Sequence, residues 1–295
     1  MKLITEKLRF RLAVYRDSDR QVSSTDNTDI PMITKLSVSH FAILLSSLLT
    51  LSACSTTQNN DDGWQNLLSP AEQKNWTAKI NHHPSGQNFA NTFRFSEDIL
   101  LVRYDGYDDF NEQFGHLFYE AELTNFHLKF EYRFTGDFLE SAPRYARLNS
   151  GVMFASQSAD SILTDQNWPV SVEMQLLAER EAGVARPTGN MCSPGTEIYY
   201  QGDIYPEHCL NSSSPTFPAG EWVRGELIVK DGHVTQLINN DVVLEYDLAL
   251  AKKDDLVTGE NPATWEQMKN LKSGYIAFQS EGQPIDFKNV YLKIL

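Results

Sequence analysis

Basic side chains are scarce in this sequence. Its 295 residues hold 25 Lys and Arg against 39 Asp and Glu, which gives a formal net charge of −14 at pH 7. A field of that sign repels phosphate backbones and makes nucleic acid a poor partner. Internal repeats are absent as well, and low-complexity sequence is limited to one short spacer.

Cysteine is also scarce, and Cys54, Cys192 and Cys209 are the whole complement. The last two form an isolated C-x16-C pair, which lacks the C-x2-C spacing typical of a zinc site. A disulfide is favoured over two free thiols or half a zinc site if the chain is exported, because disulfides persist outside the cytoplasm.

Export is indicated by the long uncharged stretch from Leu36 to Ala53. Lys35 precedes it and small residues close it, which is typical of a secretory signal. A transmembrane helix is the alternative, but the serines within the stretch and the polar sequel STTQNNDD disfavour it. LSAC resembles the lipobox of bacterial lipoproteins, which implies cleavage before Cys54 and lipidation of its sulfur.

We therefore expect a protein of the bacterial cell envelope that faces the periplasm or the exterior. It would be held to the membrane by lipid at Cys54, with Cys192 joined to Cys209. Residues 1–53 would be the signal peptide preceded by a charged extension that does not fit one, with translation starting at Met32. Residues 54–63 are polar and without apolar period, as a disordered spacer is, and 64–295 would form one domain.

Helical periodicity is confined to two short segments, 69–76 and 261–271, each with a capping residue and a proline at its start. From residue 99 onward the apolar residues recur at every second position, most clearly over 126–134. The turn sequences KDGH and NND separate further alternating runs. The pattern predicts an all-β domain, a jelly-roll sandwich of two antiparallel sheets.

The outer face of such a sandwich can hold a groove, so polar residues on the non-core side of a strand are candidates for function. Glu173 and Gln175 alternate with apolar residues in 170–177 and should project side by side. Sandwich glycosidases of the laminarinase type need two carboxylates at such a place, one acid and one nucleophile. Gln175 cannot be a nucleophile, which disfavours an ordinary retaining glycosidase. A solvated strand face is the alternative.

Three further residues offer hydrogen-bond donors. Arg147 and Asn149 should share a face at the start of the strand RYARLNSGVMF, and Arg133 lies on the polar face of 126–134. Such donors hold sugar hydroxyls or a carbonyl oxygen. A turn ending in Asn-Ser-Gly is the plainer interpretation of the first two.

His116, at a strand entrance, is a candidate acid, base or metal ligand, although a lone histidine is more often structural. Gln279 and Glu281 lie two apart near the C-terminus and are candidates for substrate binding. Trp168 and Tyr104 offer flat faces to a sugar ring, although most such aromatics belong to a core.

The ordered set GHLFYEAELTNFHLKFEYRF, RLNSGVMF, WPVSVEMQLL, RPTGNMCSPGTE, EWVRGELIVKDGHVTQLINNDVVLEY and GYIAFQSEGQPIDFKNVYL resembles the 3-keto-disaccharide hydrolase domain family. The resemblance covers residues 64–295. It implies a concanavalin A-like fold, shared with lectins and glucanases, and many members are secreted or lipid-anchored. Relatives often read EVQ where this chain reads EMQ, and the segment 156–168 looks individual.

The resemblance implies cleavage of glycosidic bonds in 3-keto-glycosides, by a hydrolase or lyase of carbohydrate metabolism. A base removes the acidic proton beside the ketone, the enolate is stabilised, the glycosidic oxygen leaves, and water adds. We expect Glu173 to be the base, with Arg133, Arg147 and Asn149 holding the ketone oxygen. The sequence requires no cofactor, but a divalent metal held by His116 and Glu173 is another way to polarise the ketone. A non-catalytic carbohydrate-binding surface lipoprotein is the alternative function.

Overall fold

The computed structural model describes residues 62–252, 257 and 262–295. These residues belong to one compact unit, Gln58–Leu295. The signal segment and Cys54 lie outside the described residues, and the predictions made for them stay predictions. No helix within the described part of the chain is long and apolar enough to cross a membrane.

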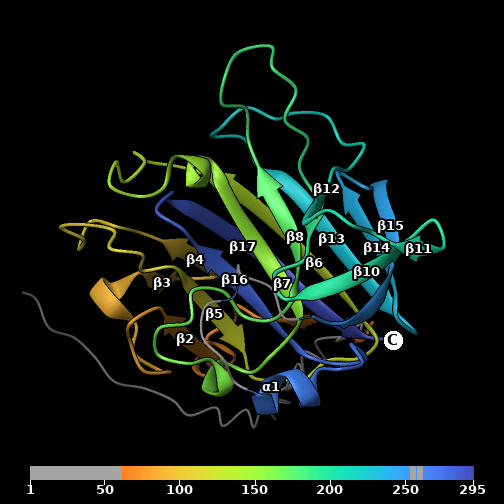
Figure 1. Ribbon diagram of the computed structural model, residues 1–295. Coiled ribbons are helices and arrows are strands. Elements are labelled where there is room, and N and C mark those ends of the chain that lie inside the picture. The colour runs from red at the N-terminus through yellow and green to blue at the C-terminus, as the bar shows by residue number, and fades with distance from the viewer. Residues whose placement is uncertain (1–61, 253–256, 258–261) are drawn as a thin grey trace, which may run out of the picture. The chain divides into compact units, whose positions relative to one another are not determined.

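Two antiparallel sheets stack face to face (Figure 1). The larger sheet has, in spatial order, β11 (Asp203–Ile204), β10 (Thr196–Tyr200), β15 (Asp241–Ala251), β14 (His233–Ile238), β13 (Val223–Lys230), β6 (Phe126–Phe134), β17 (Ile285–Ile294), β4 (Ile99–Val102) and β3 (Phe93–Ser96), with β1 (Gln65–Asn66) paired to β17. The smaller sheet has β12 (Cys209–Leu210), β9 (Asn190–Cys192), β8 (Val172–Leu177), β7 (Asn149–Ser156), β16 (Tyr275–Ser280), β5 (Gly115–Tyr119) and β2 (Trp76–Ile80). The predicted all-β jelly-roll sandwich is confirmed.

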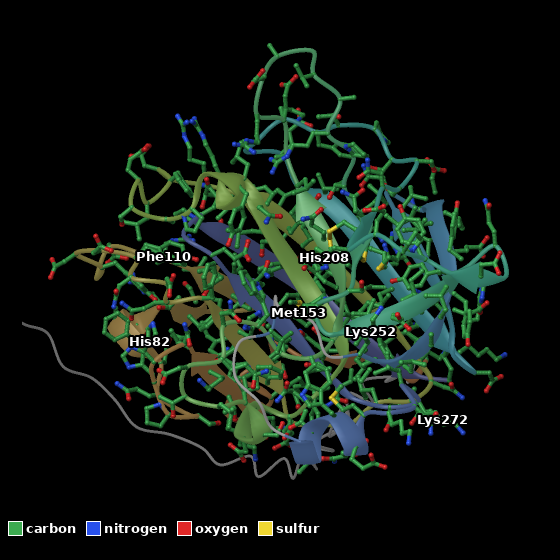
Figure 2. The ribbon with its side chains drawn as sticks, in the orientation of Figure 1. His82, Phe110, Met153, His208, Lys252 and Lys272 are labelled. Carbon is green, nitrogen blue, oxygen red and sulfur yellow. A yellow bond between two sulfur atoms is a disulfide. The ribbon has the colours of Figure 1, made fainter. Side chains whose placement is uncertain are left out.

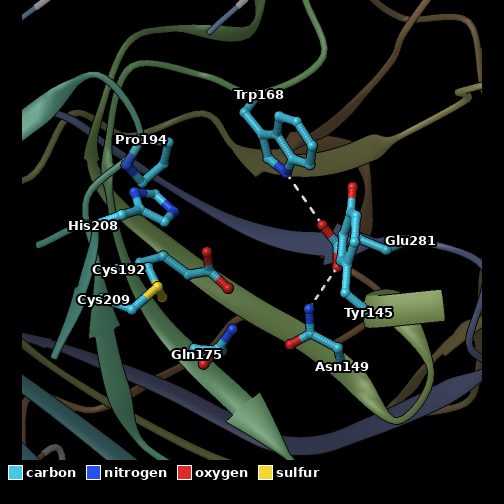
Figure 3. A pocket seen from close by; sticks show the side chains of 10 residues that line it. Tyr145, Asn149, Trp168, Gln175, Cys192, Pro194, His208, Cys209 and Glu281 are labelled. Atoms are coloured by element: carbon cyan, nitrogen blue, oxygen red, sulfur yellow. Dashed lines mark hydrogen bonds between the residues drawn. A yellow bond between two sulfur atoms is a disulfide. The ribbon is translucent and has the colours of Figure 1, made fainter. Parts of the chain in front are cut away.

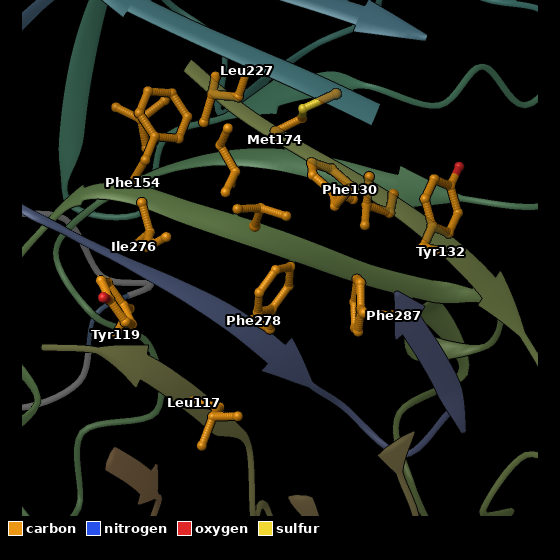
Figure 4. Packing of buried hydrophobic residues seen from close by; sticks show 14 of the residues in the cluster. Leu117, Tyr119, Phe130, Tyr132, Phe154, Met174, Leu227, Ile276, Phe278 and Phe287 are labelled. Carbon is orange, nitrogen blue, oxygen red and sulfur yellow. The ribbon is translucent and has the colours of Figure 1, made fainter. Parts of the chain in front are cut away.

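The period-two pattern decides which face of each strand is buried. Along β6, every second side chain from Phe126 to Phe134 is buried, and those between are only partly so. Phe278 of β16 reaches across to the larger sheet, where its ring lies 6.1 Å from Phe130 and 4.4 Å from Phe287 between centroids (Figure 4). The core therefore fills the space between the sheets, and the opposite face of the seven-stranded sheet is left for other side chains.

The two helical predictions had different outcomes. Segment 261–271 contains α1 (Pro262–Gln267), as predicted. The helix predicted over 69–76 is wrong, because only the 3₁₀ turn η1 (Gln73–Asn75) forms before Trp76 begins β2. The Trp76 ring packs against Tyr119 and Phe278. This packing outweighs the local helical preference.

Three more 3₁₀ turns occur in the described residues: η2 (Phe89–Asn91), η3 (Arg144–Ala146) and η4 (Ala159–Ser161). The turn η3 leads into β7, and η4 begins the segment that the sequence marked as individual. Of the two, only η3 borders the candidate site, through Tyr145.

Cys192 and Cys209 are joined by a disulfide, as predicted. The two residues are register partners on β9 and β12, with their Cα atoms 4.1 Å apart. The bond ties the short edge strand β12 to the sheet and closes the loop 193–208.

We predict that Cys192→Ser with Cys209→Ser lowers the free energy of unfolding by about 3 kcal/mol, because the open loop gains conformational freedom in the unfolded chain. Denaturant titration of the variant and of the oxidised wild type measures the difference. Reduced wild type is the matched control and should fall to the level of the variant. A variant as stable as the oxidised protein would show that the bond contributes nothing.

Candidate active site

A pocket of about 280 Å³ opens on the outer face of the seven-stranded sheet (Figure 3). Its lining combines carboxyl, amide and aromatic side chains with the disulfide: Tyr145, Asn149, Trp168, Glu173, Gln175, Cys192, Pro194, His208, Cys209 and Glu281. Five of the residues proposed from the sequence, Asn149, Trp168, Glu173, Gln175 and Glu281, therefore meet in one place.

The strand β8 delivers two of them. Glu173 and Gln175 both line the pocket, while Val172, Met174 and Leu176 between them belong to the inter-sheet core. The predicted projection of the two polar side chains from the non-core face is confirmed.

Gly151 on β7 makes room for Glu173. It is the register partner of Gln175, two positions along from the Met153–Glu173 pair. A Cβ at Gly151 would lie 2.3 Å from the Glu173 Oε1, which is far inside contact distance. The lack of a side chain at Gly151 thus lets the Glu173 carboxyl lie across the neighbouring strand.

Glu281 follows directly after β16 and is held by two donors. The Asn149 Nδ2 donates to its Oε2 at 2.8 Å, and the Trp168 Nε1 donates to its Oε1 at 3.1 Å (Figure 3). Trp168 closes the 156–168 segment, so the part of the sequence that looks individual supplies a pocket residue. Sequence reasoning did not foresee that Glu281 and Glu173 would share a pocket.

The two carboxyl groups differ in their surroundings. Burial raises the pKa of Glu281 to about 7, against the effect of Trp168 and Asn149, which favour the charged form. Burial, followed by the nearby charge of Glu281, raises the pKa of Glu173 well above its usual value. The Glu173 Oε1 has no hydrogen-bond partner among the described residues. The Glu281 charge acts on Glu173, so Glu281 is the group that ionises first, and the protonated form of Glu173 is favoured.

The rim of the pocket holds residues that the sequence did not single out. Tyr145 of η3 stands half exposed beside Glu281, and burial together with the Glu281 charge raises the pKa of its phenol. His208 and Pro194 stand on the opposite side, next to the disulfide (Figure 3). Both residues lie in the loop that the Cys192–Cys209 bond closes. This was the one feature of the sequence that could have indicated them, because the bond fixes that loop against the sheet.

Arg133 does not reach the pocket, so the prediction that it joins Asn149 is wrong. It lies on β6 of the other sheet, where its guanidinium pairs with Asp286 at 2.9 Å and stacks 4.5 Å from the Trp222 ring centroid. Arg147 is exposed and precedes β7, and Leu148, with φ of 52°, breaks the alternation that would have aligned it with Asn149. The predicted shared face of Arg147 and Asn149 is wrong for that reason.

His116, Gln279 and Tyr104 are likewise outside the lining. His116 on β5 and Gln279 on β16 are buried register partners. Burial, then the charge of Lys79, lowers the pKa of His116 to about 3. Tyr104 is buried with its ring 5.2 Å from that of Tyr107.

The predicted metal site of His116 and Glu173 is wrong in its geometry. Their strands β5 and β8 are separated by β16 and β7, which places them about 14 Å apart across the sheet. Within the described residues, the one cluster of three metal-type ligands is Cys192, His208 and Cys209. Its sulfurs are bonded to each other and offer no thiolate.

Residues 60–293 match the model of the 3-keto-alpha-glucoside-1,2-lyase-like domain. The match covers most of the chain, and the chain belongs to this family. Among curated relatives, a 3-keto-disaccharide hydrolase of Bacteroides thetaiotaomicron is 24% identical over 197 residues, which are 61% of this chain and 62% of that protein. The chain thus spans less than two thirds of this relative.

Solved structures resemble the chain only remotely. One named "putative glycosyl hydrolase", from Parabacteroides distasonis, is 18% identical with a TM-score of 0.47, covering 79% of this chain and 99% of that one. The carbohydrate binding module CBM66 from Bacillus subtilis is 8% identical with a TM-score of 0.42, covering 74% and 95%. At these values the two structures say nothing about what this chain does.

We predict that Glu173→Gln stabilises the protein more at pH 8 than at pH 5. A carboxyl whose pKa is raised on folding supports the fold below its unfolded pKa and costs stability as pH rises from there. Each pKa unit corresponds to about 1.4 kcal/mol, and the gain at pH 8 should exceed the gain at pH 5 by at least that amount. Denaturant titrations at the two pH values measure it.

Glu221→Gln, at an exposed carboxylate, is the matched control and should change stability equally at both pH values. A gain from Glu173→Gln that does not depend on pH would contradict a protonated Glu173.

Proposed function

We propose that the pocket cleaves 3-keto-glycosides by removing a proton beside the ketone, eliminating the glycosidic oxygen and adding water. The observation that supports this most is the pair of buried carboxyl groups with separated pKa values. Such a pair provides a base and an acid at one pH. Family membership and the name of the Bacteroides relative support the substrate class.

Glu281 is the better base of the two. Its two hydrogen-bond donors favour the carboxylate, and a pKa of about 7 matches a base that works near neutral pH. The base role expected for Glu173 from the sequence accordingly passes to Glu281 in our proposal. Glu281 takes the proton from the carbon between the ketone and the glycosidic carbon, and the electron pair moves onto the ketone oxygen.

Glu173 supplies the acid. Its proton passes to the glycosidic oxygen as the enolate collapses and the bond from the glycosidic carbon breaks. The resulting enone then takes water at that carbon: the Glu173 carboxylate accepts the water proton, and Glu281 returns its proton to the neighbouring carbon. The two groups end in their starting states, and the net reaction is hydrolysis.

Gln175 is the candidate donor to the ketone oxygen as that oxygen gains charge. Its Oε1 accepts a hydrogen bond from Asn190 at 3.1 Å, which directs the amide N–H groups toward the pocket. Tyr145 and Trp168 provide ring faces against which a sugar can pack.

Direct hydrolysis of an ordinary glycoside is the second candidate. The sequence disfavoured direct hydrolysis, because Gln175 stands where a second carboxylate was needed beside Glu173. In the folded protein, Glu281 provides a second carboxylate in the same pocket. A carbohydrate-binding protein without turnover is the third. These functions differ in the substrate that is cleaved and in the fate of the hydrogen beside the ketone.

The deciding experiment compares 4-nitrophenyl 3-keto-glucoside with 4-nitrophenyl glucoside in D₂O. Our proposal expects nitrophenol release from the keto-substrate and deuterium on the carbon beside the ketone, read by mass spectrometry. A reaction without enzyme corrects for spontaneous exchange. Release from the plain glucoside without deuterium would establish direct hydrolysis. Binding without release from either substrate would establish the non-catalytic function.

We predict that Glu281→Gln lowers turnover of the keto-glucoside by about 100- to 10,000-fold, the usual loss with a positioned base. In the wild type, kcat/KM should rise with pH through about 7 as Glu281 loses its proton. Circular dichroism checks the fold, and Glu221→Gln is the control. Turnover within about threefold of wild type, under 1 kcal/mol of barrier, would remove Glu281 from the base role.

We also propose that the protein is lipid-anchored at Cys54 and acts in the bacterial cell envelope. The LSAC sequence supports this, and so does the disulfide, which forms outside the cytoplasm. Cys54→Ser should move the protein out of the membrane fraction or block its processing. Unchanged fractionation would count against the anchor.

A further inference from the structure

The arginines of the described residues divide into two sets. One set is paired with carboxylates: Arg94 with Asp105, Arg103 and Arg133 with Asp286, and Arg224 with Glu226. The other set has no carboxylate partner within the described residues: Arg144, Arg147, Arg180 and Arg186. In a protein with many more acidic than basic residues, four arginines without such a partner call for an explanation.

These four arginines, which we name the arginine rim, gather at one place. Asn149 at the start of β7 is the register partner of Leu177 at the end of β8, so the segments outside these two residues are neighbours. The Arg180 Nη2 donates to the carbonyl of Arg144 at 3.0 Å, and the Arg186 Nη2 donates to the carbonyl of Arg147 at 3.3 Å. The guanidinium groups of Arg180 and Arg186 thus bind backbone oxygens of the segment that carries Arg144 and Arg147, which makes the four residues neighbours.

The positive charge of one rim arginine affects the pKa of another. Burial, followed by the charge of Arg180, lowers the pKa of Arg186 to about 10. Two carboxylates, Glu179 and Glu181, lie in the same segment, and Glu179 accepts a hydrogen bond from the Gly183 backbone at 3.0 Å. Neither forms an ion pair with the rim, and the charge of Glu112, which acts on Tyr145 between Arg144 and Arg147, is likewise not paired with a rim arginine.

The rim borders the pocket without entering it. Tyr145 and Asn149 line the pocket, and Arg144 and Arg147 are interleaved with them along the chain. The pKa of Glu281 is set by burial, Trp168 and Asn149, with no arginine contributing. The rim is therefore placed to meet a part of the substrate beyond the reacting carbons.

We propose that the arginine rim binds a carboxylate or sulfate group on the sugar unit next to the keto-sugar, so that the preferred substrate is an acidic saccharide. The proposal rests on the function proposed for the pocket. Guanidinium groups present paired N–H donors that match the oxygens of either anion. Exposed Arg144 and Arg147, for which the structure shows no side-chain hydrogen bond, are the members most open to such a ligand.

The test compares three 3-keto-glucosides whose second sugar is glucose, glucuronate or glucose 6-sulfate. The preference is the kcat/KM of each acidic substrate divided by that of the neutral one. We expect a preference of roughly tenfold or more in the wild type, the scale of one charge-assisted hydrogen bond, and a decrease with added NaCl. Arg144→Gln with Arg147→Gln should reduce the preference to near one.

Lys269→Gln with Lys272→Gln is the matched control, because it removes the same charge from exposed positions near α1. Figure 2 shows Lys272 far from the pocket residue His208. This control should keep the full preference. Thermal melting confirms that both double variants are folded.

A preference for one acidic substrate alone supports the proposal and identifies the anion. Equal kcat/KM for all three substrates in the wild type, or a preference that survives in the arginine variant, overturns it. If none of the three is cleaved, the proposed function fails. Calorimetric titration of the same protein with the corresponding non-keto disaccharides then decides the rim, and equal affinity for neutral and acidic sugars overturns it.

Discussion

The contact of Phe278 with Phe130 and Phe287 joins the two sheets, and the remaining structure depends on it. Each strand of the seven-stranded sheet must give one face to this contact layer. Alternation then places every second residue on the opposite face, where no sheet covers it. The pocket residues of β7 and β8 occupy those positions, and the same alternation that fills the core thus sets the direction of Glu173 and Gln175.

The pocket contains an energetically unfavourable arrangement, and packing of the core must offset its free-energy cost. Two carboxyl groups are buried within electrostatic reach of each other, and one of them keeps an oxygen without a hydrogen-bond partner in the described residues. Burying such a group costs free energy, since water no longer solvates its charged form. A chemical role gives this cost a reason, because a raised pKa is what a carboxylic acid needs to hold a proton at neutral pH.

The two sides of the pocket are built differently. On one side the disulfide fixes His208 and Pro194 against the edge of the sheet. On the other, Tyr145 stands on a short 3₁₀ turn, between Arg144 and Arg147 of the arginine rim in the sequence. A rigid wall facing a charged, exposed rim suits a substrate whose reacting ring is enclosed and whose second unit extends outward. The negative field of the whole protein also makes a local positive rim more selective, because it repels anions elsewhere.

The sequence by itself determined what depends on neighbours along the chain. Period two predicted the strands and the outward direction of Glu173 and Gln175, and the leftover cysteine pair predicted the disulfide. Tertiary structure decided what depends on strand order, which the period does not encode. Glu281 meets Glu173 because β7 alone separates β16 from β8, whereas Arg133, with an equally regular pattern, lies on the other sheet. The helix expected up to Trp76 does not form, because packing of the Trp76 ring across the core outweighs the local helical preference. The positive φ of Leu148 breaks the alternation, so Arg147 does not share the face of Asn149.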